Sequence, residues 1–205
     1  MELVRGQMVQ GHLGGYVPGG DPNTTYPALW DWLIGTLAVS SVLDVGCGDG
    51  SGCLSHFMAD DRVSHALGID GLVAPNLPAG VQVFPHDFTQ GPWTDFDGGP
   101  LVTGFDLVWC CEFVEHVHEE FVPNYLPAFK AADLVLMTHA LPGQGGHHHV
   151  NCRSSDYWQG AMAAIGYRLD PDLTATARRL ATEETIDPSA NYFARTGMAF
   201  RRVSV

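Results

Sequence analysis

The feature that most constrains the fold is a short apolar run followed at once by alternating glycines, over residues 42–50 (VLDVGCGDG). Its first four residues are mostly β-branched and apolar, which predicts a strand buried on both faces of a parallel sheet. The residues that follow, up to Met58, can form a helix. Glycine suits the turn between them because a tight turn needs unusual backbone angles and because a ligand can approach bare backbone. The stretch therefore predicts the first half of a nucleotide-binding crossover.

The order of acids and glycines favours a cationic nucleoside over a dinucleotide. A dinucleotide-binding turn reads G-x-G-x-x-G and holds pyrophosphate on the helix N-terminus. This turn instead reads D-x-G-x-G-x-G and contains no Lys or Arg. Its first acid, Asp44, suits a positively charged ligand. Asp70 ends the next predicted strand, about twenty residues past the turn, where a carboxylate commonly holds a ribose diol.

Four segments, in sequence order, resemble motifs I to IV of class I S-adenosylmethionine-dependent methyltransferases. They are residues 43–50 (LDVGCGDG), 68–71 (GIDG), 86–88 (HDF) and 105–117 (FDLVWCCEFVEHV), at separations similar to those of the family. Together they cover residues 40–140. A glycine- and histidine-rich tract, residues 141–151, also resembles a segment of small stand-alone methyltransferases often found in phage genomes.

The resemblance implies an α/β fold: a single Rossmann-like domain over residues 1–205, with a seven-stranded, mostly parallel sheet, an antiparallel final strand and helices on both faces. Residues 40–140 would form the cofactor-binding core. The implied cofactor is S-adenosyl-L-methionine, which leaves as S-adenosyl-L-homocysteine. The implied cofactor-binding residues are Asp44, Gly46, Cys47 and Gly48 along the methionine and adenosine path, Asp70 and Gly71 at the ribose, Asp87 and Phe88 at the adenine edge, and Cys110 near the methyl.

Composition agrees with one soluble domain and places it in the cytoplasm. The 205 residues are 45% hydrophobic, which is ordinary for a globular protein. No apolar run approaches the ~18 residues of a membrane span, and the first residues lack the features of a secretion signal. Five cysteines, an odd number, favour reduced thiols. A net charge of −13 disfavours nucleic acid as a partner, although five arginines give the C-terminal part some positive charge.

Apolar spacing predicts most of the remaining elements. Helices are expected over residues 27–37 and 157–165, and strands over 63–70, 81–84, 105–109 and 133–138. We expect the helix over residues 121–131 to be interrupted at its prolines, and that over 72–80 to be short or absent. Residues 173–185 fit either a helix or an insertion. Residues 192–203 are predicted to form a hairpin or one strand broken at Gly197.

The first 26 residues are rich in Gly and Pro, and we expect no regular secondary structure there. Two interpretations stay open. The segment either folds over the cofactor as a lid, with Tyr16 or His12 near the sulfonium, or forms a flexible leader.

Histidines supply the candidates for a catalytic base. The chain has 10, and several follow the predicted fourth and fifth strands, where an acceptor would lie. With an unperturbed pKa of ~6.5, histidine is a serviceable base at neutral pH. We predict His139 or His148 as the base, with Glu112 and His116 as the next candidates.

The same tract raises the alternative of a metal site. In an extended loop His147 and His149 point the same way, so they could share one ion with Glu112 or Glu115. Metal-dependent sugar and catechol methyltransferases use mostly carboxylates, however, and sequence spacing alone rarely fixes a site. We therefore predict that no metal is bound.

The favoured function is methyl transfer from S-adenosylmethionine to a small-molecule, sugar or glycan acceptor, most simply at oxygen with a histidine base. A nucleic-acid or nucleotide methyltransferase is the first alternative. The Asn/Asp-Pro-Pro-aromatic tetrad that holds a flipped base is replaced by Cys-Cys-Glu-Phe at residues 110–113, and the Pro-Cys nucleophile of cytosine-carbon enzymes is missing. A non-catalytic cofactor-binding module is the second alternative.

Overall fold

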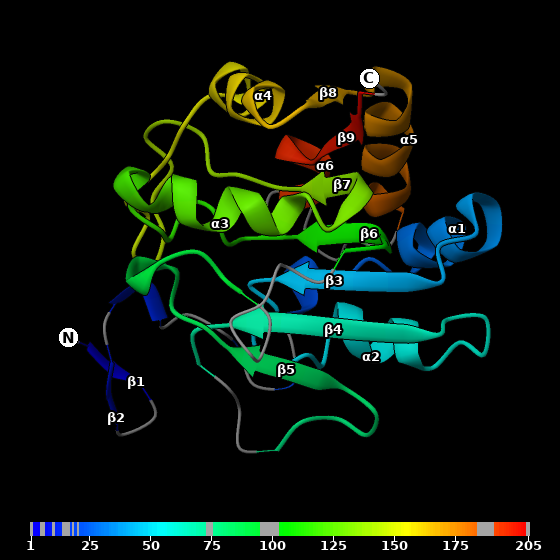
Figure 1. Ribbon diagram of the computed structural model, residues 1–205, viewed down its shortest axis with the longest axis horizontal. Helices are drawn as coiled ribbons and strands as arrows, with labels where there is room; N and C mark the ends of the chain where they lie inside the picture. Colours follow the sequence, from blue (N-terminus) through cyan, green and yellow to red (C-terminus); the bar gives the residue numbers. More distant parts are fainter. Residues whose placement is uncertain are drawn as a thin grey trace.

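The computed structural model describes residues 2–4, 7–9, 11–13, 17, 19, 21–72, 76–94, 103–183 and 191–203. Seven strands form one sheet in the order β5-β4-β3-β6-β7-β9-β8 (Figure 1). The strands are β3 (Ser41–Val45), β4 (His65–Asp70), β5 (Gln82–Pro85), β6 (Phe105–Cys110), β7 (Ala132–Met137), β8 (Tyr167–Leu169) and β9 (Met198–Arg202).

Neighbours from β5 to β7 are parallel, whereas β9 runs antiparallel to both β7 and β8. The predicted seven-stranded, mostly parallel sheet with an antiparallel final strand is thereby confirmed. The final strand does not lie at the edge, however, because it enters between β7 and the short β8.

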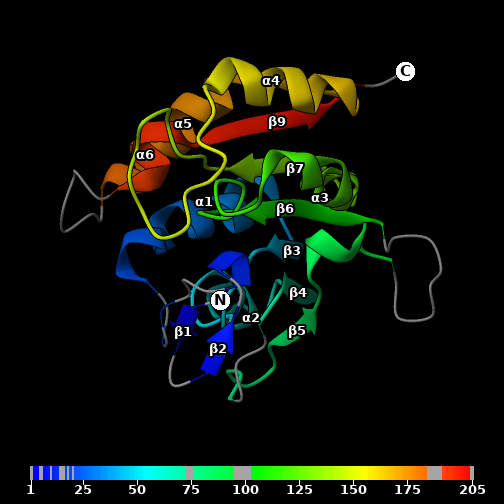
Figure 2. The ribbon, with the colours of Figure 1, turned by 90° about the vertical axis from the view of Figure 1, so that its left-hand side faces the viewer.

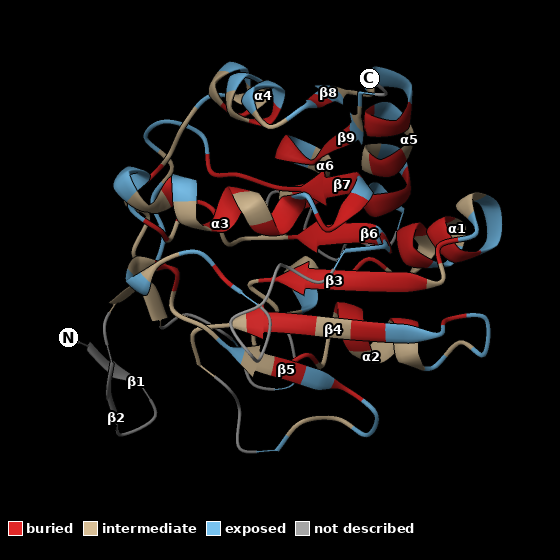
Figure 3. Ribbon diagram, in the orientation of Figure 1, coloured by how far each residue is buried: buried red, intermediate tan, exposed pale blue. Residues whose placement is uncertain are grey.

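Helices cover both faces of the sheet, as predicted. The helices α1 (Pro27–Leu37), α2 (Cys53–Met58) and α5 (Pro171–Thr182) lie on one face, and α3 (Val122–Phe129) and α4 (Ser155–Ala164) on the other (Figures 1 and 2). Each face has its own hydrophobic core. Successive strand residues enter opposite cores, so Val42 packs with α1 and α2 while Leu43 packs with α3. Strands β3, β6 and β7 are buried along almost their whole length (Figure 3).

Two predictions about proline- and glycine-rich segments were wrong. Helix α3 is continuous, because Pro123 occupies its first turn, where the missing N–H costs nothing, and Pro127 removes only one helical hydrogen bond. The N-terminal segment does contain regular structure: β1 (Glu2–Val4) pairs with β2 (Gln7–Val9), and 3₁₀ turns form at η1 (Gly11–Leu13) and η2 (Pro22–Thr24).

The C-terminal region also differs from expectation. Residues 192–196 form the helix α6 (Tyr192–Thr196) rather than a strand, because the Asn191 side chain caps it by accepting a hydrogen bond of 2.8 Å from the Ala194 amide. The undecided stretch is helical as far as Thr182, as part of α5, which Asp170 caps by accepting a hydrogen bond from the Leu173 amide; residues 184 and 185 lie outside the described part of the chain. Two further 3₁₀ turns are η3 (Phe88–Gln90) and η4 (Glu119–Phe121).

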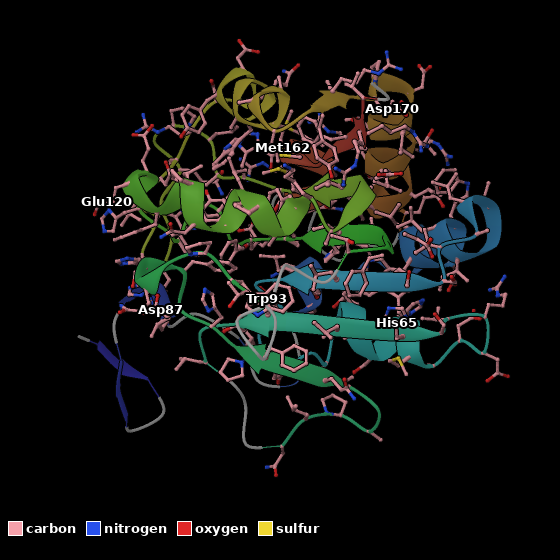
Figure 4. The ribbon with its side chains drawn as sticks, viewed as in Figure 1. His65, Asp87, Trp93, Glu120, Met162 and Asp170 are labelled. Carbon is pink, nitrogen blue, oxygen red and sulfur yellow. The ribbon has the colours of Figure 1, made fainter. Side chains whose placement is uncertain are left out.

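The carboxyl ends of the parallel strands meet at one edge of the sheet, the left-hand edge in Figure 1, and the N-terminal elements lie at the same edge. Asp87, just past β5, is at this edge, whereas His65, which begins β4, is at the opposite end (Figure 4). Open α/β sheets bind ligands at the carboxyl ends of their strands, so we expect the ligand site at this edge. In the described part of the chain, no helix has the length and apolarity needed to cross a membrane.

Candidate functional site

The glycine turn after β3 adopts backbone angles that favour glycine. Gly46, Gly48 and Gly50 all have left-handed φ values, of 82°, 60° and 70°. The space beside the turn is also restricted, because a Cβ on Gly46 would come within 2.6 Å of the Phe113 side chain. The Gly46 amide donates to the Ile69 carbonyl at 2.8 Å, which joins the turn to β4. The turn is therefore held in place while presenting bare backbone.

Asp70 connects the end of β4 to the glycine turn. Its two carboxylate oxygens accept hydrogen bonds of 2.9 Å from the amides of Gly48 and Leu72. Burial raises the pKa of Asp70 to about 6, although the backbone hydrogen bonds oppose that rise. The carboxylate is thus fixed by the backbone before any ligand is present.

Asp44 is the second acid of this region, and its side chain is buried at the end of β3. Burial raises the pKa of Asp44 well above its usual range, and the neighbouring charge of Asp70 raises it further. A hydrogen bond with Cys53 acts in the opposite direction. A positively charged ligand beside these two acids would stabilise both carboxylates.

The two acids and the glycine turn line a cavity of about 310 Å³ at the carboxyl ends of the parallel strands. No Lys or Arg is present among the described residues that line it. Most of the residues predicted from the sequence meet there: Asp44, Gly46, Cys47, Gly48, Asp70, Gly71, Asp87, Phe88, Glu112 and His116.

Three predicted residues do not line this cavity. Cys110 is fully buried in the core on the α3 side, and its neighbour Cys111 lines the cavity instead. His139 is also buried: its Nδ1 donates to the Ala140 carbonyl at 3.3 Å and its Nε2 accepts from the Ser155 hydroxyl at 3.0 Å. The His139 ring therefore has a structural role: it links the segment after β7 to the first residue of α4.

His148 does not line the cavity. It has a left-handed φ of 46°, and its ring packs so closely on Gly11 that a Cβ there would come within 2.6 Å of Nδ1. Its neighbours His147 and His149, which do line the cavity, alternate with it along the loop. Geometry therefore places His148 in contact with the N-terminal segment.

Two glutamates lie close together on the far side of the cavity. The Glu112 amide donates to Thr138 Oγ1 at 2.8 Å, and Glu112 has a left-handed φ of 52°. Burial raises the pKa of Glu112 to about 7. Glu115 is fully buried, and neither of its carboxylate oxygens accepts a hydrogen bond from a donor group among the described residues; its side chain faces the Glu112 carboxyl, with which it can share a proton. Burial, together with the charge of Glu112, raises the pKa of Glu115 well above its usual range.

Glu115, His116 and His149 offer ligand atoms that all lie within 4.8 Å of one another, close enough to share one metal ion. The Nδ1 atom of His116 is buried and has no hydrogen-bond partner in the described structure. Burial, with His149 nearby, lowers the pKa of His116 to about 4, so its ring is neutral and can ligate at neutral pH. Unpartnered carboxylate and imidazole atoms fit a divalent transition ion.

This grouping differs from the one expected from the sequence. The sequence suggested His147 and His149 as metal ligands, whereas the structure groups His116 with His149. The Nε2 atom of His147 instead donates to the Gly11 carbonyl at 3.2 Å. The structure thus brings together a group of possible metal ligands that loop periodicity alone did not reveal.

Several lining residues were missed at the level of sequence, namely Asp21, Cys111 and Tyr192. The signal for Cys111 was available: because side chains alternate along a strand, Cys111 shares the face of Trp109 and not that of Cys110. Asp21 and Tyr192 lie in segments far from the four motifs, and no pattern in the sequence connects them to the site.

No family model matches the sequence, and a search of curated proteins finds no match. Solved structures do match. The methyltransferase domain of bacterial CtHen1 has a TM-score of 0.58 and 16% identity, over 89% of this chain and 100% of that one. The O-methyltransferase NcsB1 from neocarzinostatin biosynthesis, in complex with S-adenosylmethionine and 2-hydroxy-5-methyl naphthoic acid, has a TM-score of 0.53 and 17% identity, over 86% of this chain and 52% of that one.

The small RNA methyltransferase HEN1 has a TM-score of 0.50 and 14% identity, over 82% of this chain and 23% of that one. The chain therefore spans about half of NcsB1 and about a quarter of HEN1. These likenesses show that the chain has the class I methyltransferase fold.

Proposed function

We propose that this protein is an enzyme that transfers the methyl group of S-adenosylmethionine. The observation that carries the proposal is the placement of Asp44 and Asp70 around a bare glycine turn, in a cavity with no Lys or Arg among its described lining residues. The sulfonium and ammonium groups of this cofactor are positively charged and suit the two acids. A pyrophosphate would meet no side-chain cation there.

The four motif segments supply the parts of the cofactor site. Asp70 would accept hydrogen bonds from the ribose diol, and Asp87 with Phe88 would meet the adenine. The methionine part would lie along the remaining residues of the glycine turn and the end of β3, which are Asp44, Gly46, Cys47 and Gly48. The similarity to the fold of NcsB1, whose structure contains S-adenosylmethionine, supports this assignment.

For the acceptor, we propose a neutral small molecule or sugar that is methylated at oxygen. The acceptor end of the cavity presents Asp21, Glu112 and Tyr192, and such groups bind hydroxyls while repelling phosphates. The net charge of −13 has the same effect at longer range. A nucleic-acid acceptor is the second candidate, favoured only by the likeness to the small RNA methyltransferase HEN1.

Methyl transfer requires the acceptor to lie in line behind the methyl group, and such positioning can lower a barrier by several kcal/mol. Glu112 lines the cavity, and Thr138 Oγ1 donates to its Oε1 at 3.2 Å, so this carboxylate is our candidate to take the hydroxyl proton. Neither His139 nor His148 reaches the cavity, so neither is retained. A divalent ion held by Glu115, His116 and His149 would, when bound, lower the pKa of an acceptor hydroxyl.

A methyl-transfer assay tests the proposal. The protein is incubated with S-adenosylmethionine and panels of neutral sugars, phenols, nucleotides and short RNA and DNA, with and without Mn²⁺, and released S-adenosylhomocysteine is measured. We expect release with a neutral hydroxyl acceptor, and much less from Asp70→Asn because its affinity for the cofactor is lower. Transfer only to nucleic acid would contradict the proposed acceptor, and failure to bind the cofactor would contradict the proposed enzyme.

A further inference from the structure

The residue after Asp70 is a glycine, so β4 offers no side chain beside the ribose-binding acid. That space is filled from elsewhere in the chain. A Cβ built on Gly71 would overlap the Cδ2 atom of Leu13, which belongs to the N-terminal turn η1. Both residues line the cavity. An apolar side chain therefore stands next to Asp70 although β4 itself does not provide one.

The turn η1 is fixed to the same edge of the sheet by its other two residues. The Nε2 atom of His12 donates to Asp87 Oδ1 at 3.1 Å, and these side chains are only 11% and 17% exposed. The carbonyl of Gly11 accepts from His147. Three consecutive residues thus contact three separate loops, those that follow β4, β5 and β7.

We propose that η1 completes the nucleoside half of the cofactor site, with Leu13 as the apolar wall against the adenine and His12 as the group that orients Asp87. The inference rests on the proposed use of S-adenosylmethionine. A purine is flat, and its two faces carry no hydrogen-bonding groups in the ring plane's normal direction, so its affinity depends on surface buried against apolar side chains as well as on polar contacts at its edge. Gly71 cannot bury such surface, whereas Leu13 can.

The first test measures binding of S-adenosylhomocysteine and of 5′-methylthioadenosine, which carries the nucleoside without the amino acid. We expect Leu13→Ala to weaken both ligands by about tenfold, the value for losing one well-buried aliphatic contact. Leu141→Ala, at a leucine that is 38% exposed and does not line the cavity, is the matched control and should leave both affinities unchanged. Melting temperatures of both variants establish that they are folded.

The second test moves the leucine from η1 to residue 71, the position that follows β4. Gly71→Leu alone should weaken nucleoside binding, because the new side chain overlaps Leu13 and displaces the turn. Gly71 does not have a left-handed φ, so its backbone accepts a leucine. The double variant Leu13→Gly with Gly71→Leu should therefore recover affinity to within about threefold of the wild type, which is a measurable coupling between contacting residues.

Two results would overturn the inference: wild-type or tighter binding by Leu13→Ala, or a double variant that binds no better than either single variant. If the wild type itself does not bind S-adenosylhomocysteine, it is the proposed function that fails. The two failures are therefore distinguishable in one series of titrations.

Discussion

The two ends of the cavity differ in how their acids are satisfied. At the cofactor end, Asp70 accepts two backbone hydrogen bonds, so its geometry is fixed by the chain itself. At the acceptor end, Glu115 is fully buried and faces the Glu112 carboxyl, and neither of its oxygens accepts a hydrogen bond from a donor group in the described structure. A buried carboxyl without partners is costly unless it is protonated or shares a cation. The first end is preorganised, whereas the second depends on a proton or an ion.

The largest expected effect is at the preorganised end. Asp70→Asn replaces one carboxylate oxygen with an NH₂ group, so the side chain can accept only one of the hydrogen bonds from the Gly48 and Leu72 amides, and without its charge. We expect S-adenosylhomocysteine affinity to fall on the order of a hundredfold, since two charge-assisted hydrogen bonds and the ribose contact are disturbed. Calorimetric titration measures the loss. The exposed Asp156→Asn is the control, and an Asp70→Asn protein with wild-type affinity would contradict the assigned role.

The next effect concerns the acceptor end alone. Glu115→Gln should weaken Mn²⁺ binding by about 10–100-fold, a range typical for disturbing a metal site, while cofactor affinity stays within about twofold. Electron paramagnetic resonance of free Mn²⁺ gives the ion affinity without relying on activity. Glu120→Gln, at an exposed glutamate, serves as the matched control. Equal Mn²⁺ binding by the wild type and Glu115→Gln would show that Glu115 is not a ligand.

The same contrast explains what the sequence could predict. The cofactor end is built from consecutive strand ends, so each of Asp44, Asp70 and Asp87 follows a recognisable apolar run. Parallel strands place those ends together whatever the rest of the chain does. The sheet and most helices were predictable for the same reason: their burial pattern is local.

The acceptor end was less predictable because it is assembled from segments far apart in the chain. His116 meets His149 only after the loop that follows β7 folds back, so that the amides of Val150 and Asn151 donate to the Glu115 carbonyl. Tyr192 lies on a helix where a strand was expected. The prolines of α3 and the composition of the N-terminal segment also misled, because a helix tolerates proline in its first turn and because the short strands β1 and β2 pair with each other. Those outcomes depend on tertiary packing and not on local composition.

A pH profile sharpens the comparison, because burial raises the pKa of Asp70 to about 6. Only the ionised carboxylate accepts hydrogen bonds from both ribose hydroxyls, so affinity should be nearly constant above pH 7. It should fall as pH drops through 6, by about tenfold at pH 5, where a tenth of the group is ionised. Titrations of S-adenosylhomocysteine in a chelating buffer from pH 5 to 8 measure it. A flat profile for the wild type, or the same fall in Asp70→Asn, would contradict this origin.

The smallest effect on catalysis is expected at His139, which lies outside both ends of the cavity. Its loss removes hydrogen bonds to Ser155 and Ala140, so His139→Ala should lower the free energy of unfolding by about 1–3 kcal/mol. Because no catalytic group is lost, methyl transfer per folded molecule should stay within about twofold of the wild type, which is on the order of experimental error. A large fall in turnover with unchanged melting temperature would restore His139 as a base.

Equilibrium dialysis of the wild-type chain against radiolabelled S-adenosylmethionine measures whether the cavity beside Asp44 and Asp70 holds this cofactor, without requiring a known acceptor. We predict saturable retention of one equivalent per chain, with half-saturation within the range of roughly 1 μM to 1 mM that is usual for enzyme ligands. No retention at about 1 mM cofactor, the upper end of that range, would contradict the account.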